Sequence, residues 1–273
     1  MSRLDRRFSA CARDNRAALI GYLTAFDPDL ETSFANLEAA CAAGLDVLEL
    51  GVPFSDPAAD GPEIQAAMVR ALAAGSTVAG VLDLAKRLRD RFSDLPIVLF
   101  SYANPLLRSA ERHTDGAIGF CRYLVERGID GLLVVDLPPE EAALLREPAR
   151  EAGLDWIALC APTSPASRRD RLVAQASGFV YAVSLTGVTG APLDAGSTAL
   201  HEQLADLRGR TALPIAVGFG VREPAQVAML ASQVEGVVVG SALVRRAGEG
   251  PAALRELVSA LQAATVRKRD GNC

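Results

Sequence analysis

Residues 47–51 read Val47-Leu48-Glu49-Leu50-Gly51, a short run of large apolar side chains with a single carboxylate inside it. Seven other short apolar runs recur along the chain, each followed by a turn rich in Gly, Pro or Asp and then by a longer stretch of helical periodicity. The runs are continuously apolar, which is typical of parallel strands covered on both faces. The eight strands expected on this basis are 18–23, 47–50, 97–100, 131–135, 156–159, 179–183, 215–217 and 237–239.

Helical segments are expected between these strands. In residues 32–43 the apolar side chains recur at helical spacing and Gly44 ends the segment, and residues 142–152 are ended in the same way by Gly153. Eight strand–helix units in about 250 residues predict an α/β fold, a single-domain (βα)8 TIM barrel over residues 1–273, with an open doubly wound sheet as the alternative. We expect residues 1–16 to form an N-terminal helical extension and residues 267–273 a disordered tail.

The composition excludes several classes of protein. Half of the 273 residues are hydrophobic and 22% are charged, with a net charge of −5, which indicates a large core and not a disordered chain. The 28 basic residues are interspersed with 33 acidic ones, so no nucleic-acid partner is expected. No apolar run approaches the roughly 18 residues that span a bilayer, and the charged N-terminus does not resemble a signal peptide. We therefore predict no membrane association and a cytoplasmic location.

The residues best suited to nucleophilic and metal chemistry are scarce or badly placed. The five cysteines contain no CxxC pair, which argues against both a disulfide framework and a zinc site. His113 and His201, the two histidines, lie in polar stretches away from the strand ends, so neither a histidine triad nor a metal site is expected. Lys86 and Lys268 offer no desolvated amine for a Schiff base. Any catalysis is therefore expected to depend on carboxylates.

Three late loops predict an anion site. In a barrel, functional residues gather where the strands end, and glycines follow the last three expected strands at 187–190, 218–220 and 240. Glycine lets backbone N–H groups approach an anion closely, and a helix that opens at Ser241 would point its positive end at the same place. We expect a phosphomonoester on a small molecule, since no GxxxxGK[ST] nucleotide loop is present; simple glycine turns are the alternative. The residues expected to bind the phosphate are Gly190, Gly218, Gly220, Gly240 and Ser241.

The carboxylate of the second run is unusual. Burying a charge at Glu49 is costly unless the carboxylate is paired, protonated or used in chemistry, although the side chain could also face outward beside a local partner. The loop that follows carries two more acids, Asp56 and Asp60, which could simply cap turns.

At this point the sequence resembles a known family. The stretch 48–57 with Ala59-Asp60-Gly61-Pro62 is similar to the signature of the tryptophan synthase alpha subunit family, and further motifs of that family follow in order from Ala18 to about Val244. They include Tyr22-Leu23-Thr24-Ala25, Ser101-Tyr102-Ala103-Asn104-Pro105, Asp136-Leu137-Pro138, Gly187-Val188-Thr189-Gly190, Gly218-Phe219-Gly220 and Gly240-Ser241.

The resemblance implies a (βα)8 barrel that cleaves indole-3-glycerol phosphate to indole and glyceraldehyde 3-phosphate in a retro-aldol reaction, without a metal ion or organic cofactor. It implies that Glu49 moves the protons and that Asp60 stabilises the positive charge of the indolenine, and it places Tyr181 with these catalytic residues. These roles predict a drier site for Glu49 than for Asp60, so that the pKa of Glu49 moves toward neutrality while Asp60 stays ionised. The substrate-binding residues implied by the resemblance are Tyr22, Phe100, Tyr102, Leu133 and Phe219.

The resemblance also implies a partner, a beta subunit that carries pyridoxal phosphate in an alpha2beta2 assembly. Three positions depart from the family pattern: Phe26 stands where glycine is usual, Ala58 replaces a larger aliphatic residue, and Glu63 replaces a small or β-branched one. The last two border the face expected to meet the partner. Three alternatives remain: a stand-alone lyase that releases free indole, a non-catalytic homologue that binds phosphate ligands and regulates a partner, and a phosphosugar isomerase, for which a histidine or lysine near a strand end is missing.

Overall fold

The structure, a computed structural model, describes residues 1–183, 197–218 and 220–267. All eight expected apolar runs are strands of one parallel sheet, and the fifth run contributes two short strands separated by Ile157. The strands are β1 (Ala18–Thr24), β2 (Val47–Gly51), β3 (Ile97–Ser101), β4 (Gly131–Val134), β5 (Asp155–Trp156), β6 (Ala158–Cys160), β7 (Val180–Val183), β8 (Ile215–Gly218) and β9 (Gly236–Val239).

The sheet closes on itself. Its strand order is β5-β4-β3-β2-β1-β9-β8-β7-β6, and β5 and β6 are consecutive parts of the same segment. Because β5 pairs with β4 while β6 pairs with β7, that segment joins the two ends of the sheet. The predicted single-domain barrel is confirmed, and the open doubly wound sheet is excluded. Most strand residues are buried, as expected for strands enclosed by helices.

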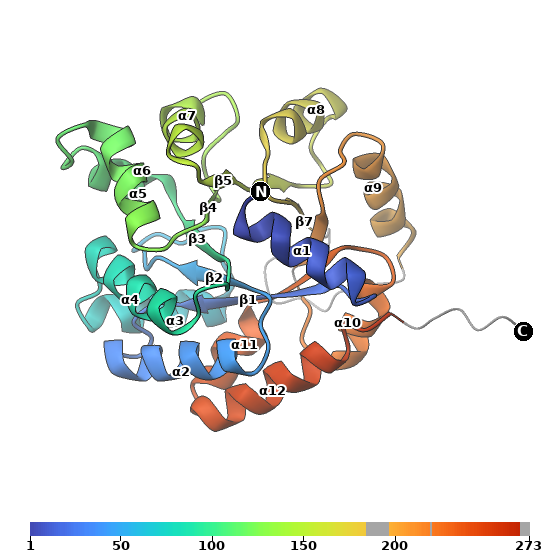
Figure 1. Cartoon of the computed structure of the whole chain (residues 1–273), viewed down its shortest axis with the longest axis horizontal. Coiled ribbons are helices and arrows are strands. Elements are labelled where there is room, and N and C mark those ends of the chain that lie inside the picture. The colour runs from blue at the N-terminus through green and yellow to red at the C-terminus, as the bar shows by residue number, and fades with distance from the viewer. Residues whose placement is uncertain (184–196, 219, 268–273) are drawn as a thin grey trace, which may run out of the picture.

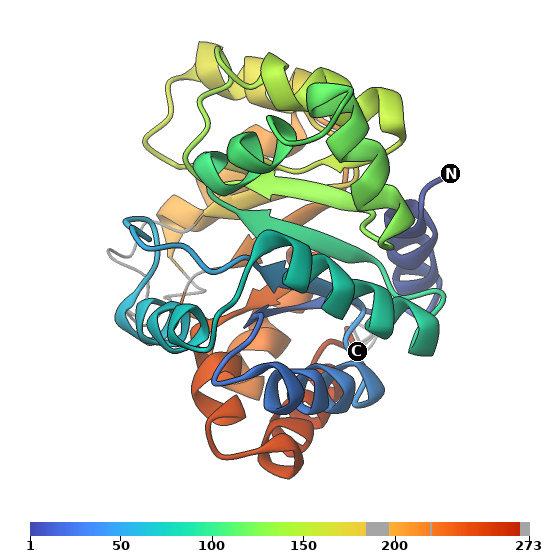
Figure 2. The same ribbon diagram turned by 90° about the vertical axis from the view of Figure 1, so that its left-hand side faces the viewer.

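Helices surround the barrel (Figures 1 and 2). Both helices expected from periodicity are present, and the second ends at Gly153, which has a φ of +88°. The described helices are α1 (Arg3–Arg13), α2 (Leu30–Ala42), α3 (Pro62–Ala73), α4 (Val78–Arg91), α5 (Ala103–Ala110), α6 (Gly116–Glu126), α7 (Ala143–Ala152), α8 (Ala166–Gln175), α9 (Thr198–Arg208), α10 (Pro224–Ala231), α11 (Ser241–Ala247) and α12 (Pro251–Ala263). Within the described ranges no single helix could span a membrane, although α3 and α4, bent by 102° at their junction, would qualify together on length and composition alone.

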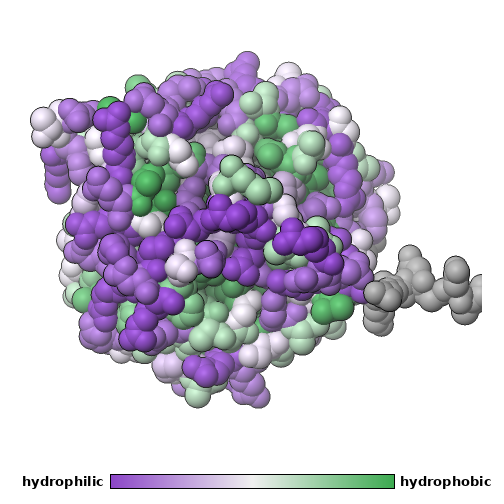
Figure 3. Space-filling view, viewed as in Figure 1, coloured by the Kyte–Doolittle hydropathy of each residue, from purple (hydrophilic) through white to green (hydrophobic). Residues whose placement is uncertain are grey.

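Helix α1 lies across the amino-terminal end of the barrel (Figure 1). The Phe8 ring packs on the Phe179 ring with centroids 5.6 Å apart, and the Arg3 guanidinium donates to Asp130 at 2.8 Å. The surface on this side is largely hydrophilic, with only scattered apolar patches (Figure 3). This end of the barrel is therefore closed by packing, and the carboxyl ends of the strands are left for a site.

Phe26, one of the departures from the family pattern, has a φ of +65°, a left-handed conformation that non-glycine residues rarely adopt. Its backbone N–H donates to Ser33 Oγ at 3.0 Å. Its ring packs on α4 at Gly80, where an added Cβ would lie only 2.8 Å from the ring. The strained residue is thus held by packing between the β1–α2 connection and α4, and its side chain does not line the site described below.

Candidate active site

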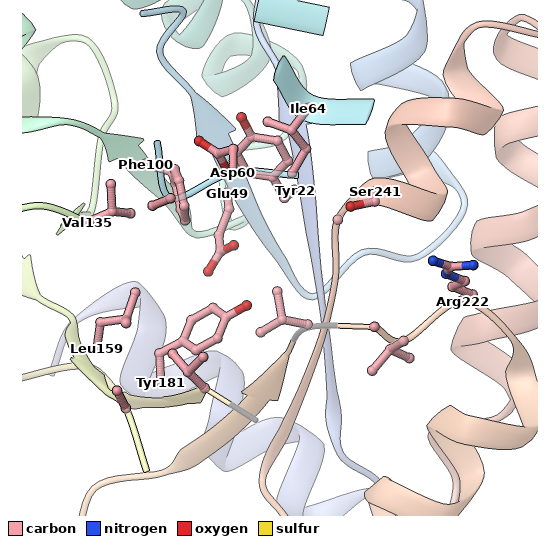
Figure 4. Close-up of a pocket in the computed structure, with 17 residues that line it drawn as sticks. Tyr22, Glu49, Asp60, Ile64, Phe100, Val135, Leu159, Tyr181, Arg222 and Ser241 are labelled. Atoms are coloured by element: carbon pink, nitrogen blue, oxygen red, sulfur yellow. The ribbon is translucent and has the colours of Figure 1, made fainter. Parts of the chain in front are cut away.

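A cavity of about 260 Å³ opens at the carboxyl ends of the strands and contains both catalytic carboxylates expected from the sequence (Figure 4). It is lined from nearly every side of the barrel, with apolar side chains in the majority. The described lining residues are Tyr22, Glu49, Ala59, Asp60, Ile64, Phe100, Val135, Leu159, Ala161, Tyr181, Val183, Gly220, Val221, Arg222, Val238, Gly240 and Ser241.

Glu49 lies in the middle of β2, between Tyr22 of β1 and Val98 of β3 in the sheet register. Its side chain enters the cavity, where Figure 4 shows the carboxyl group between Phe100 and Tyr181. The residue is 1% exposed, and its Oε1 has no hydrogen-bond partner among the described residues. Burial raises the pKa of Glu49 to about 8. The structure therefore excludes the outward-facing alternative and leaves a carboxyl group that holds its proton at neutral pH.

Asp60 lies in the loop between β2 and α3. The Tyr102 hydroxyl donates to Asp60 Oδ2 at 2.6 Å and accepts the N–H of Ala59 at 3.0 Å. Burial raises the pKa of Asp60 to about 6, and the bond from Tyr102 opposes the rise. The residue that caps α3 is Gly61, so Asp60 is not the helix cap. Burial raises the pKa of Glu49 further than that of Asp60, in the expected direction, but Asp60 is desolvated as well, which the sequence did not predict.

Two tyrosines form opposite walls of the cavity, and each requires a glycine beside it. An added Cβ at Gly51 would overlap the hydroxyl of Tyr22, and one at Gly218 would overlap the hydroxyl of Tyr181. The Tyr22 ring also meets the Phe100 ring edge to face, with centroids 5.0 Å apart. Gly218 thus makes room for Tyr181 and is not itself a lining residue. The three rings give the cavity an apolar slot suited to a flat aromatic ligand.

The end of the cavity formed by the loops after β8 and β9 is the expected anion end. Gly220, Gly240 and Ser241 all line it. Gly220 has a φ of +82°, a conformation that favours glycine. Gly190 and Phe219, which the sequence placed in this site, lie outside the described residues.

Two other expected site residues do not line the cavity. The Tyr102 ring stacks on Phe54 with centroids 5.0 Å apart, and its contribution to the site is the hydrogen bond to Asp60. Leu133 is completely buried in β4, beside Phe100 in the register. Asp56 is exposed, accepts a hydrogen bond from Ser55 and does not line the cavity.

About half of the lining residues were not expected from the sequence. Val238 and Leu159 belong to expected strands, but nothing in an apolar run says which side chain points inward. Arg222 carried a usable signal, because it stands two residues after Gly220 in one of the expected phosphate loops. Among the described residues, no group of three or more His, Cys, Asp or Glu side chains is arranged to hold a metal ion.

Comparisons with known proteins agree with this geometry. A family model described as tryptophan synthase alpha chain matches residues 8–270. The tryptophan synthase alpha chain of Halorhodospira halophila is 49% identical over 271 residues, covering 97% of this chain and 96% of that protein. The alpha chain of Gluconacetobacter diazotrophicus is 47% identical over 271 residues and covers 96% of each protein. Among solved structures, Mycobacterium tuberculosis tryptophan synthase matches with a TM-score of 0.89 at 39% identity, over 98% of this chain and 99% of that one.

Proposed function

The chain belongs to the tryptophan synthase alpha chain family, whose members are lyases, and on this premise we propose that it cleaves indole-3-glycerol phosphate to indole and glyceraldehyde 3-phosphate. One observation carries the proposal: a buried carboxyl group, Glu49, shares an apolar cavity with a second carboxyl group, Asp60, and with two glycines of the expected anion site, Gly220 and Gly240. The indole ring would lie in the slot beside Tyr22 and Phe100, and the phosphate at the Gly220 and Ser241 end.

The reaction needs one acid that becomes a base. Glu49 is protonated near neutral pH, because its pKa is about 8, and it donates that proton to C3 of the indole ring. The ring nitrogen then carries the positive charge, and the Asp60 carboxylate stabilises it by accepting the N–H hydrogen bond. Asp60 is mostly ionised above pH 6, so both groups are in the required state near neutrality.

The second half of the reaction restores Glu49. Its carboxylate accepts the proton of the glycerol hydroxyl next to the ring as the carbon–carbon bond breaks. The electron pair of that O–H bond forms the aldehyde of glyceraldehyde 3-phosphate, and the pair of the broken bond returns to the ring as indole. Burial raises the pKa of Tyr181 well above its usual value, so its hydroxyl stays protonated and faces the substrate as a hydrogen-bond donor and not as a base. The protons balance within the site, and no cofactor takes part in this scheme.

A beta subunit is the proposed partner, in an alpha2beta2 assembly in which the partner carries the pyridoxal phosphate. The structure gives one relevant fact: Ala58 and Glu63, the departures expected to border this interface, are both exposed. They are therefore available for contact. A cytoplasmic location stays a prediction.

The deciding experiment incubates the purified chain with indole-3-glycerol phosphate, alone and with a beta subunit, and measures the indole or tryptophan formed. Turnover that depends on the partner supports a synthase subunit, and rapid release of indole without the partner supports the stand-alone lyase. No turnover in either condition, with phosphate-ligand binding retained, supports the regulatory homologue and overturns the proposal. As a check on roles, Asp60→Asn is expected to lower turnover by at least about 10²-fold while affinity for glycerol 3-phosphate stays within tenfold.

A further inference from the structure

The charges around the cavity are unbalanced for the proposed substrate. Among the described lining residues the ionisable groups other than tyrosines are Glu49, Asp60 and Arg222. Near neutral pH Glu49 is neutral and Asp60 is negative. A phosphomonoester brings nearly two further negative charges, since its second pKa is about 6. Backbone N–H groups supply only partial charges, so Arg222 is the single full positive charge that the described lining offers to the phosphate.

Arg222 also stands at the appropriate end of the cavity. It follows Gly220 and Val221 in the loop after β8, and these three residues line the cavity together with Gly240 and Ser241. Figure 4 shows Arg222 on the same side as Ser241, whereas Leu159 and Val135 lie on the opposite side. The two carboxyl groups that carry the chemistry are also nearer to that opposite side in this view. Arg222 is thus placed for the phosphate and not for the reacting bond.

The backbone that carries Arg222 is held in place by a side chain of α10. The N–H groups of Arg222 and Glu223 both donate to Gln226 Oε1, at 2.8 and 3.2 Å. Gln226 Nε2 donates back to the Gly220 carbonyl at 3.5 Å. The loop is therefore tied to the first turn of α10 at three points. Arg222 itself is half-buried, so less side-chain entropy is lost when it binds a ligand than for an exposed arginine.

We propose that Arg222 binds the phosphate group of the substrate and makes the site selective for doubly charged phosphomonoesters. The inference rests on the proposed function and adds to it a residue that sets specificity. A guanidinium group matches phosphate oxygens with two parallel N–H donors and is weakly hydrated, which suits a partly buried contact. Because the phosphate is remote from the bond that breaks, the contact is made equally in the ground and transition states and acts mainly on KM.

The test compares Arg222→Met with Arg245→Met in the full-length chain. Arg245 lies on α11, the helix that begins at Ser241, but it is exposed and does not line the cavity, so its replacement changes the net charge equally. Binding of glycerol 3-phosphate and of indole is measured by calorimetry. In Arg222→Met we expect affinity for glycerol 3-phosphate to fall about 10- to 100-fold, as for a hydrogen bond to a charged group, while affinity for indole stays within about twofold. Arg245→Met should change neither by more than about twofold.

The same variants separate the roles kinetically. Arg222→Met should raise KM for indole-3-glycerol phosphate by a similar factor and leave kcat within a few-fold, and Arg222→Lys, which keeps the charge but not the paired donors, should fall between it and the wild type. If Arg222→Met does not fold, Arg222→Lys decides the question, because loss of the paired donors should weaken glycerol 3-phosphate binding and leave indole binding unchanged.

The outcomes distinguish this inference from the proposed function. Equal affinity for glycerol 3-phosphate in the wild type and in Arg222→Met, or equal losses for glycerol 3-phosphate and indole, would overturn the role of Arg222 while leaving the lyase intact. A wild-type chain that neither binds glycerol 3-phosphate nor forms indole would remove the proposed function, and this inference with it.

Discussion

The two ends of the barrel treat buried carboxylates in opposite ways. Asp46 stands directly before β2 and Asp130 directly before β4, at the amino-terminal end, whereas Glu49 lies three residues further along from Asp46 and reaches the cavity. Their exposures are similar, 1% for Asp46, 8% for Asp130 and 1% for Glu49. Burial alone therefore does not separate them.

The surroundings do separate them. Asp46 accepts hydrogen bonds from both Nη atoms of Arg16, at 2.5 and 2.9 Å, and from the backbone N–H of Leu19 at 2.9 Å. Asp130 accepts hydrogen bonds from Arg89 at 2.6 Å, from Arg3 of α1 at 2.8 Å and from the backbone N–H of Ile97 at 2.8 Å. These charged and backbone donors compensate the desolvation of both aspartates. Through Arg3 and Arg89, Asp130 also connects α1 and α4 to the start of β4.

Glu49 has no such compensation. Its Oε1 finds no partner among the described residues, and burial is the cause of its raised pKa. A buried acid with an unpaired oxygen is costly to stability and suits the proton transfer proposed for Glu49. The arginine partners of Asp46 and Asp130, and their absence at Glu49, thus distinguish two acids that hold the fold together from the acid proposed to carry out the chemistry.

The largest expected effect is that of Glu49→Gln on turnover. The amide keeps the shape of the side chain but can neither donate nor accept the transferred proton, so kcat for indole formation should fall by about 10²- to 10⁴-fold. Thermal unfolding of the same variant at neutral pH should occur at an equal or higher temperature, because ionisation of Glu49 favours the unfolded wild type and the amide cannot ionise. Turnover that survives Glu49→Gln would remove this residue as the proton shuttle.

The converse effect is expected at the other end of the barrel. Asp46→Ala leaves Arg16, whose side chain is only 15% exposed, with just the exposed carboxylate of Asp14 at 3.6 Å, and should lower the free energy of unfolding by about 3–5 kcal/mol. The kcat of the folded fraction should stay within a few-fold of the wild type, because Asp46 does not belong to the cavity lining. Urea unfolding followed by circular dichroism gives the first quantity, and initial rates below the unfolding midpoint give the second.

An exposed pair provides the matched control. Glu31 accepts hydrogen bonds from both Nη atoms of Arg87, at 2.9 and 3.0 Å, in the same two-point geometry as Asp46 and Arg16. Its side chain is 72% exposed, so water compensates the loss of its partner. Glu31→Ala should leave both stability and turnover nearly unchanged. A loss of stability as large as that of Asp46→Ala would show that burial is not what makes the Asp46 pair costly to break.

This contrast also marks the limit of what the sequence could predict. The eight apolar runs predicted the barrel because a continuous apolar run between turns has few other uses, and the carboxylate in Val47–Gly51 could be recognised as costly within such a run. Asp46 is adjacent to the same run, yet its partner Arg16 lies 30 residues away. Pairing across that distance depends on how α1 and β1 meet, which no local pattern encodes.

The lining of the cavity shows the same limit. Glu49, Asp60 and Tyr181 were expected, and all three line it. Leu133 was expected there too, and it pairs with the lining residue Phe100, but it is wholly buried and does not line the cavity. How deep a side chain lies below the cavity depends on the stagger of the closed sheet, which a single strand does not encode. Arg222 lies in a loop whose backbone is held by a hydrogen bond to the Gln226 side chain. No motif in the sequence indicates that contact.

A smaller effect follows from the proton that Glu49 holds. The unfolded chain releases it near pH 4.5, whereas the folded chain keeps it up to about pH 8. Between these values the folded state binds more protons, so the free energy of unfolding falls as the pH rises, by on the order of a few kcal/mol in total. The difference in stability between Glu49→Gln and the wild type should grow from pH 4.5 to 8 and level off above it. Denaturant unfolding at several pH values measures this, and a difference independent of pH would show that Glu49 is not held protonated.

The smallest effect concerns Tyr102, which sharpens the comparison because its hydroxyl partly compensates Asp60. Its hydrogen bond favours the carboxylate, so Tyr102→Phe should raise the pKa of Asp60 above its value of about 6. Since Asp60 is proposed to act when ionised, the acid limb of kcat/KM against pH should move upward, with activity at about pH 6.5 lower by about two- to fivefold and recovering as the pH rises.

The basic limb near pH 8 reports Glu49, whose raised pKa comes from burial, and should stay in place in Tyr102→Phe. The phosphate of the substrate titrates near pH 6 as well, but it is the same in both proteins and cannot move the limb. A pH profile in which both limbs move together, or neither does, would mean that Tyr102 only packs on Phe54 and does not set the charge of Asp60.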